Sequence, residues 1–409
     1  MPGGVPQHSG HLASNVAVVG FGPAGGALAL MLARMRRRVT LFERAPQLGP
    51  VGAGILLQPS GQAVLQKLGL LEQVAERSER IEMLHAVQAS GRTMVRLRYD
   101  GALPDAVAYG VHRGVLFETL HKAADDAGVD IRVGHEIVDV RESPDGATLV
   151  DQRGATFGPF DMTAICDGSR SRLRQTVDPA ARATAYDYGA LWAVGPCTQV
   201  RGYLHQTVAG TRQLCGVLPI GDARATLFWG MRADQFEALR QSSFADFRDE
   251  VLLLCPQAEE IFTGFHSFEQ ATLARYAHAA PRKLFTAHTV LVGDAAHAMS
   301  PHLGQGANLA LIDADALAWS LARSATLTAA FERYAAATRD RVRFYSRLSR
   351  VLSPFFQGGG FVLGLGRDIA LPLMTLVPPL RRQMELSLAG LKCGVFRFSP
   401  AETDHPNAR

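Results

Sequence analysis

Residues 15–25 read NVAVVGFGPAG, and this stretch decides the fold. Its first five residues are mostly β-branched and apolar, which predicts a short buried strand. A glycine turn follows, and the apolar residues 24–35 then predict a helix. A second strand is expected at residues 39–42 and ends in Glu43. Strand, helix and strand in this order form one βαβ unit, the beginning of an α/β sheet.

The glycines of this stretch have the spacing GxGxxG, which is typical of a dinucleotide-binding turn. Gly20 permits the tight turn, Gly22 lets the backbone approach a pyrophosphate, and Gly25 lets helix and strand pack closely. The helix N-terminus presents free N–H groups to the phosphates, and Glu43 can hold ribose hydroxyls. A glycine turn that only packs is the alternative, and the motif alone does not separate FAD from NAD. The predicted contacts are Gly20, Gly22, Pro23, Ala24, Gly25, Glu43 and Arg44.

A second motif begins at Asp167-Gly168, directly after the apolar run 162–166. An Asp-Gly pair alone is usually a turn. Here Ser171 and Arg174 complete the pattern DGxxSxxR, and this spacing favours a functional role for Asp167.

The third motif reads GDAAH at residues 293–297 and continues to residue 308. It follows a buried strand expected at 289–292 and leads into a helix expected at 307–322. The Asp294 carboxylate can bind the sugar-alcohol chain of a flavin, and the helix N-terminus would stabilise negative charge on a reduced flavin ring. A helix-capping turn, the alternative, does not explain so many small residues. The predicted flavin contacts here are Asp294, Pro301, Gly304, Gln305, Gly306, Ala307 and Asn308.

Together the three motifs resemble, in order and spacing, those of the single-component flavoprotein aromatic hydroxylases, over roughly residues 15–345. Two further segments are similar to that family: HRGVL at 112–116 and GAGI at 52–55. The resemblance implies that Arg113 contacts FAD and that Gly54 belongs to a loop beside the flavin. It also implies the para-hydroxybenzoate hydroxylase fold.

The expected fold class is α/β, with a Rossmann-like FAD-binding βαβ domain, a mainly antiparallel substrate sheet and C-terminal helices. The FAD-binding domain is discontinuous, because its motifs lie near residues 20, 167 and 293. Helices are also expected at 61–76, 116–127 and 327–352. The predicted division is 1–80, 109–180 and 285–345 for the FAD-binding domain, 81–108 and 181–284 for the sheet domain, and 346–409 for the C-terminal region.

The resemblance implies a monooxygenase that uses NAD(P)H and O2. The flavin is reduced, forms a flavin hydroperoxide and hydroxylates a phenolic, heteroaromatic or quinone-like ring. No second GxGxxG is present, as expected where the nicotinamide nucleotide binds only transiently. Two alternatives stay open: a flavin-dependent reductase or epoxidase of a polyprenyl or polycyclic substrate, and a flavin-containing protein that binds ligands without turnover.

Candidate substrate contacts come from the expected antiparallel sheet and from the third motif. Tyr203 and His205 alternate on one face of an expected strand, so His205 is the candidate base for a substrate phenol. The alternative is a sheet histidine on the solvent face. Arg212 and Trp229 lie on neighbouring segments, although a tryptophan there is more often core, and His302 lies in the flavin loop.

Composition excludes several other classes of protein. A net charge of +4 without a long basic run gives no reason to expect nucleic acid. Five cysteines without a CxxC pair predict neither disulfides nor a metal site, which favours a cytoplasmic protein. No apolar run is long enough to predict a transmembrane helix. The apolar residues 349–394 either cover the FAD-binding domain, form a dimer contact or face lipid, so monomer, homodimer and peripheral membrane contact all remain open.

Overall fold

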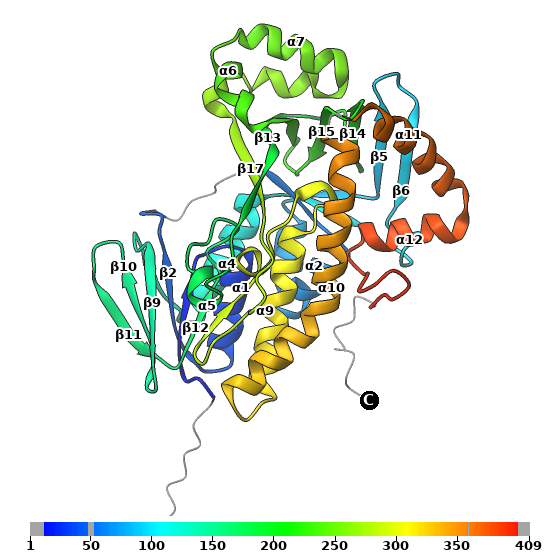
Figure 1. The fold of residues 1–409 in the computed structure, drawn as a ribbon. Coiled ribbons are helices and arrows are strands. Elements are labelled where there is room, and N and C mark those ends of the chain that lie inside the picture. Colours follow the sequence, from blue (N-terminus) through cyan, green and yellow to red (C-terminus); the bar gives the residue numbers. More distant parts are fainter. Residues whose placement is uncertain (1–11, 48–52, 359, 400–409) are drawn as a thin grey trace, which may run out of the picture.

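A computed structural model describes residues 12–47, 53–358 and 360–399. Its centre is a five-stranded parallel sheet (Figure 1). The order of the strands shows that segments far apart in sequence lie side by side, since β1 pairs with both β2 and β12. From one edge to the other, the strands are β18 (Thr289–Leu291), β12 (Met162–Ile165), β1 (Asn15–Val19), β2 (Arg38–Glu43) and β8 (Asp130–Val133).

Helices cover one face of this sheet and bury the largest apolar cluster of the protein. Helix α1 packs against both α4 and α9, and α9 packs against α10 and α2. The expected helix over 61–76 is two helices, because Gly69 adopts a positive φ of 66° between them. These helices are α1 (Pro23–Arg34), α2 (Pro59–Lys67), α3 (Leu71–Ala75), α4 (Arg113–Asp126), α9 (Gly306–Ala322) and α10 (Leu327–Phe356).

The opposite face of the parallel sheet is covered by a small antiparallel sheet. Phe42 and Ile165 on the parallel sheet share a buried cluster with Leu149 and Phe160 on the small one. The short helix α5 (Arg174–Val177) lies against β18. The strands of the small sheet are β9 (Ile137–Ser143), β10 (Gly146–Asp151) and β11 (Thr156–Phe160).

A seven-stranded sheet forms the second large unit, and all but one of its strand pairs are antiparallel. The exception is the parallel pair of β14 and β5, which joins residues 203–208 to residues 83–88. The expectation of a mainly antiparallel sheet beside the βαβ domain is therefore confirmed. In order across the sheet, the strands are β17 (Thr272–His278), β13 (Thr184–Pro196), β16 (Arg224–Arg232), β15 (Gln213–Pro219), β14 (Tyr203–Ala209), β5 (Met83–Gln88) and β6 (Thr93–Arg98).

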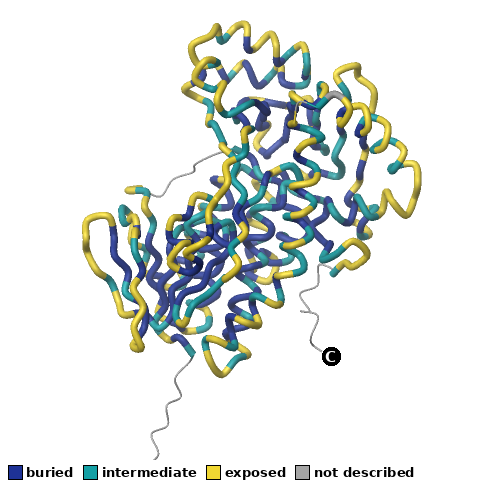
Figure 2. The backbone as a smooth tube through the Cα atoms, viewed as in Figure 1, coloured by how far each residue is buried: buried dark blue, intermediate teal, exposed yellow. Residues whose placement is uncertain are grey.

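Short elements connect and cover these units. A three-stranded sheet of β3 (Gly54–Leu57), β7 (Ala108–His112) and β4 (Glu79–Ile81) links the two large sheets. Helices α6 (Phe236–Arg240) and α7 (Phe244–Leu254) lie at one end of the molecule, where α7 covers a buried cluster of the seven-stranded sheet. Helix α8 (Asp294–His297) carries the third motif, and the chain ends in α11 (Phe361–Leu376) and α12 (Pro378–Leu388). Buried residues concentrate in the interior of the molecule, and exposed residues lie along its periphery (Figure 2).

Candidate functional site

The three glycines of the first motif have different surroundings. Gly20 has a φ of 100°, and a Cβ added there would lie 2.7 Å from the carbonyl oxygen of Cys166. A Cβ added at Gly25 would lie 2.0 Å from the carbonyl oxygen of Gly20. A Cβ at Gly22 would meet nothing within 4 Å, although Gly22 sits at the N-terminus of α1. The packing of the chain accounts for Gly20 and Gly25, whereas Gly22 borders open space of the kind a pyrophosphate requires.

The acid at the end of β2 is held against the glycine turn. One carboxylate oxygen of Glu43 accepts a hydrogen bond from the Phe21 N–H at 2.8 Å, and the other accepts one from the Ala45 N–H at 3.0 Å. Arg44, the next residue, is exposed. The Glu43 side chain is thus fixed beside the dinucleotide turn, and its contact with ribose stays a prediction.

The second motif supplies a buried arginine that ties it to the third. The Arg174 guanidinium donates to the carbonyl oxygen of Ala295 at 2.6 Å and to that of Asp294 at 3.1 Å. Its backbone N–H donates to the Ser171 hydroxyl at 3.0 Å. Only 1% of Arg174 is exposed. The arginine of DGxxSxxR therefore positions the backbone that carries Asp294.

Asp167 lies at the carboxyl end of β12, close to the same backbone. One of its carboxylate oxygens is buried and has no hydrogen-bond partner. Burial raises the pKa of Asp167 to about 6, and the Ser171 hydroxyl, Arg174 and Arg44 oppose this rise. An unpartnered buried oxygen carries a desolvation cost, so this site suits a ligand that donates a hydrogen bond.

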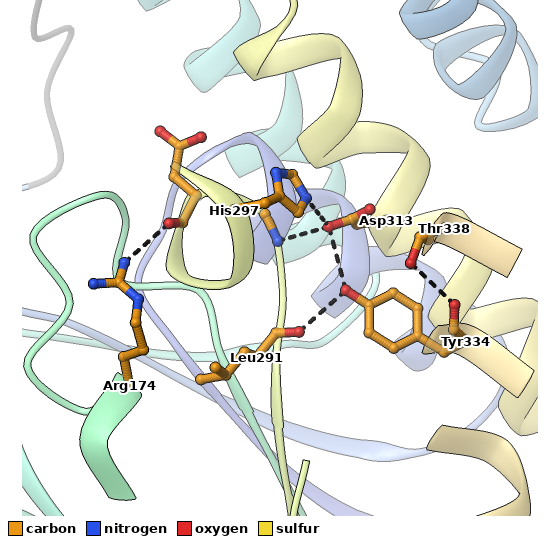
Figure 3. Close-up of polar contacts among 8 residues, drawn as sticks. Arg174, Leu291, His297, Asp313, Tyr334 and Thr338 are labelled. Carbon is orange, nitrogen blue, oxygen red and sulfur yellow. Dashed lines mark hydrogen bonds and ion pairs between the residues drawn. The ribbon is translucent and has the colours of Figure 1, made fainter. Parts of the chain in front are cut away.

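A buried polar network fixes the loop after β18. The Asp313 carboxylate accepts a hydrogen bond from the Gly293 N–H at 2.9 Å and lies 2.6 Å from His297 Nε2 (Figure 3). The Tyr334 hydroxyl reaches both this carboxylate, at 3.2 Å, and the carbonyl oxygen of Leu291, at 3.1 Å. Burial lowers the pKa of His297, but the Asp313 carboxylate outweighs it and the net shift of the pKa is upward.

Seven of the seventeen predicted cofactor contacts line one cavity of about 400 Å³, called here the inner cavity. Burial raises the pKa of Asp294, while His297 and Arg113 oppose the rise. Of the GAGI segment, Gly52 lies outside the described residues, whereas Ala53, Gly54 and Ile55 line the cavity. The predicted residues that line it are Gly54, Arg113, Asp294, Pro301, Gly304, Gly306 and Ala307.

The side chains of Gln305 and Asn308 do not line the inner cavity, and the contact of these two residues with the flavin stays a prediction. The Asn308 amide donates to the carbonyl oxygen of Leu56 at 3.0 Å, and its oxygen accepts from the Gln58 N–H at 2.9 Å. The Gln305 amide points toward the carbonyl oxygen of Leu388, at 3.4 Å. Both side chains hold the loop against neighbouring backbone, because they lie on the side of the loop away from the cavity.

The opposite wall of the inner cavity is one face of the seven-stranded sheet. Gln206, Gly216, Phe228 and Trp192 are paired in one row across four strands. A Cβ at Gly216 would lie 2.4 Å from the Phe228 ring, so this glycine makes room for the phenylalanine. The large uncharged side chains that line the cavity from the sheet are Leu84, Trp192, Leu204, Gln206, Leu214, Leu218, Phe228 and Tyr276. None of these eight was a predicted site residue. Side chains of a strand alternate between the two faces of the sheet, and this alternation indicates which residues share the cavity face.

His205 and Tyr203 lie on the other face of that sheet, and the expectation that they contact substrate is corrected. Successive strand residues point to opposite faces, and it is Leu204 and Gln206 that line the cavity. The His205 ring is 3% exposed and lies 3.1 Å from the Thr207 hydroxyl. The alternative of a solvent-facing histidine is also wrong.

Arg212 and Trp229 line a second, larger cavity of about 1090 Å³, the outer cavity. The Trp229 side chain is 4% exposed and packs edge-on against Phe247 of α7, so most of it is core. The two cavities are neighbours, because Tyr276, Ser300, His302 and Gln357 line both.

His302 is the predicted pocket residue that the structure places between the two cavities. Its Nδ1 lies 2.9 Å from the Ser300 hydroxyl, and its buried Nε2 makes no hydrogen bond of ordinary geometry. Burial lowers the pKa of His302 to about 4. The ring is therefore neutral at pH 7 and offers one nitrogen to a ligand.

No group of three or more metal-binding side chains occurs within residues 12–47, 53–358 and 360–399. No helix in this part of the chain is long and apolar enough to cross a membrane.

The FAD binding domain family matches residues 13–351. 3-Hydroxybenzoate 6-hydroxylase of Klebsiella oxytoca is 29% identical over 341 residues, which cover 75% of this chain and 79% of that protein. Aurachin C monooxygenase/isomerase of Stigmatella aurantiaca is 28% identical over 344 residues, which cover 80% of this chain and 85% of that protein. Klebsiella pneumoniae HpxO, whose structure was solved with FAD and uric acid, has the same fold, with a TM-score of 0.78. The two sequences are 20% identical, and the match covers 91% of this chain and 97% of HpxO.

Replacing Gly22 or Gly25 by alanine should have separable effects. We expect Gly25→Ala to lower the unfolding free energy of the FAD-free protein by about 1–3 kcal/mol, because its Cβ overlaps a backbone oxygen. Gly22→Ala should leave that stability unchanged and weaken FAD binding roughly tenfold or more, since its Cβ enters the phosphate space. Denaturant titration and quenching of flavin fluorescence measure the two quantities. Equal FAD affinity in Gly22→Ala and the parent would contradict this assignment.

Asp167→Asn should stabilise the FAD-free protein at pH 7. The folded-state pKa of Asp167, about 6, exceeds the ordinary value of 3.8, so the folded protein binds the proton more tightly. Stability should therefore fall as pH rises from about 4 to 6, by an amount on the order of 3 kcal/mol. Asparagine removes this loss, so the two proteins should differ at pH 7 and converge at pH 4. Denaturation curves with the same pH dependence in both proteins would argue against a raised pKa.

Proposed function

Because this chain belongs to the FAD binding domain family, we propose that it is a flavoprotein monooxygenase that hydroxylates an apolar aromatic substrate with NAD(P)H and O2. FAD is its cofactor. One observation carries the proposal: the predicted flavin loop and an apolar sheet face enclose the same cavity. A flavin on the loop side would face a ring held on the sheet side.

The residues present suit the pyrophosphate, the ribose and the flavin part of the cofactor. Gly22 and the N-terminus of α1 provide space and N–H groups for the pyrophosphate, and Glu43 lies beside them. Asp294 and Arg113 border the inner cavity, where the sugar-alcohol chain and the ring would lie. When bound, FAD takes electrons from NAD(P)H and activates O2 for transfer of one oxygen atom. The chain's own residues orient the substrate and exclude water.

The sheet face favours a neutral substrate of some size over a small carboxylate. Of the fourteen sheet residues that line the inner cavity, thirteen are uncharged, and most of these are apolar. The charged one is Arg275, which is exposed on the edge strand β17. Away from the edge that carries Arg275, a carboxylate placed against the sheet would lose its hydration without gaining an ion pair. Fused-ring and alkyl-substituted phenols or N-heteroaromatics fit this wall.

His302 and Gln206 are the side chains best placed to hold a substrate hydroxyl. Both line the inner cavity, and His302 presents a neutral ring nitrogen without a hydrogen bond. With its pKa lowered to about 4, His302 acts as a hydrogen-bonding group and not as a strong base. A cytoplasmic setting is part of the proposal, because all five cysteines are free.

A substrate screen tests the proposed function. The FAD-loaded protein is mixed with NADH or NADPH and with neutral fused-ring phenols, N-heteroaromatics, quinone precursors or small hydroxybenzoates. We expect the neutral, larger aromatics to accelerate NAD(P)H oxidation and to gain one oxygen atom by mass spectrometry. Acceleration by small benzoates alone would refute the substrate class, and no oxygen gain from any compound would refute the monooxygenase.

Substitutions at two histidines test the placement of substrate. His302→Ala should lower kcat/KM for hydroxylation roughly 3- to 10-fold, the value of one hydrogen bond, and release more hydrogen peroxide per NAD(P)H consumed. His302→Asn keeps a hydrogen-bonding group and should lose less. His205→Ala is the matched control: per FAD-loaded molecule it should keep the parent's ratio of product to NAD(P)H. If His205→Ala uncouples the reaction and His302→Ala does not, the assignment of the two faces is wrong.

A further inference from the structure

Helix α11 exposes a continuous row of large apolar side chains. Five of them, between 54% and 79% exposed, follow one another at intervals of three or four residues. At 3.6 residues per turn they fall within roughly 80° of one another around the helix. Leu380, at the start of α12, is also exposed. The five residues, called here the apolar stripe, are Val362, Leu365, Ile369, Leu373 and Leu376.

The charged residues of α11 are turned away from the apolar stripe and are paired. Arg367 is 1% exposed, forms an ion pair with Asp368 at 2.5 Å, and donates to the carbonyl oxygens of Phe355 and Gly210. The helix packs on β6 and against α10 and α12, at the margin of the molecule (Figure 1). Its outer side therefore offers apolar surface without charge.

The segment of the chain that contains this helix is basic. Residues 343–399 contain eight arginines and lysines but two acids, a net charge of +6, whereas the whole chain has +4. Both acids are neutralised locally, because Asp368 pairs with Arg367 and Glu385 lies 4.0 Å from Arg381. Arg381 and Arg382 are exposed directly after the apolar stripe. The remainder of the chain is therefore slightly acidic, and the net positive charge lies in the segment that carries the exposed apolar surface.

We propose that the apolar stripe and Arg381–Arg382 dock on the surface of an anionic lipid bilayer, with α11 lying in the interface. Large apolar side chains on one side of a helix, with arginines at its end, match an acyl boundary bordered by anionic headgroups. A second copy of the chain is the less suitable occupant, because a symmetric contact would bring two regions of charge +6 together.

Docking in this orientation would place the cavities near the bilayer. Gln357, at the end of α10, lines both cavities, and α11 begins a few residues later. An apolar compound dissolved in the bilayer would then enter close to the apolar sheet face. The docking itself does not depend on the proposed function, since it needs neither substrate nor turnover.

Vesicle sedimentation tests the proposal. The FAD-loaded protein is spun with vesicles of phosphatidylcholine alone or mixed with phosphatidylglycerol. We expect it to bind the mixed vesicles much more tightly. The pair Arg381→Ala and Arg382→Ala should weaken this binding roughly 30-fold. The pair Ile369→Ser and Leu373→Ser should weaken it by a similar factor or more. Leu253→Ser, an 88% exposed leucine on α7, is the matched control and should bind like the parent.

The FAD content of each variant checks its folding, and light scattering gives its mass in solution. Equal binding to both kinds of vesicle, or none, would overturn the proposal. So would a dimeric parent that becomes monomeric in the Ile369→Ser and Leu373→Ser variant, because a second copy would then cover the apolar stripe. The arginine variant changes exposed side chains only, so it decides the question if the apolar variant does not fold. Failure here would leave the substrate screen unaffected.

Discussion

The Asp313 carboxylate accepts a hydrogen bond from the backbone of Gly293 and lies in contact with His297 and Tyr334. A buried carboxylate is costly unless its oxygens are satisfied, so this arrangement tolerates few alternatives. Its partners come from the loop after β18 and from α10, and Asp313 itself lies on α9. The backbone that carries Asp294 is therefore held by two hydrogen bonds, one to Asp313 and one from Arg174.

The inner cavity, beside this backbone, lies between two kinds of structure. Its loop side is polar, rich in small residues and built from the ends of parallel strands, where α/β proteins bind their ligands. Its sheet side is broad and mainly apolar. Neither side could serve both purposes: close approach to a flavin needs glycine and free N–H groups, whereas holding an apolar ring needs large side chains.

The motifs could be predicted from the sequence because their causes are local. Gly20 and Gly25 are required by a positive φ and by contacts within one βαβ unit, and these constraints fix the glycine spacing. The substrate face could not be chosen this way. Moving one position along β14 exchanges His205 for Gln206, so the choice depends on which face α7 covers. Asp313 was missed for a similar reason: nothing local distinguishes it from Asp315, the other acid of the apolar helix α9.

Leu388 lines the inner cavity, and the Gln305 amide lies against its carbonyl oxygen. The wall of the cofactor's cavity thus includes residue 388 as well as residues 53–56, more than 300 positions earlier in the sequence. During synthesis the chain emerges from its N-terminus, and the βαβ unit can form early from local contacts. The cavity cannot close until residue 388 has been made. A chain that ends before residue 388 would therefore lack part of the enclosure that retains FAD.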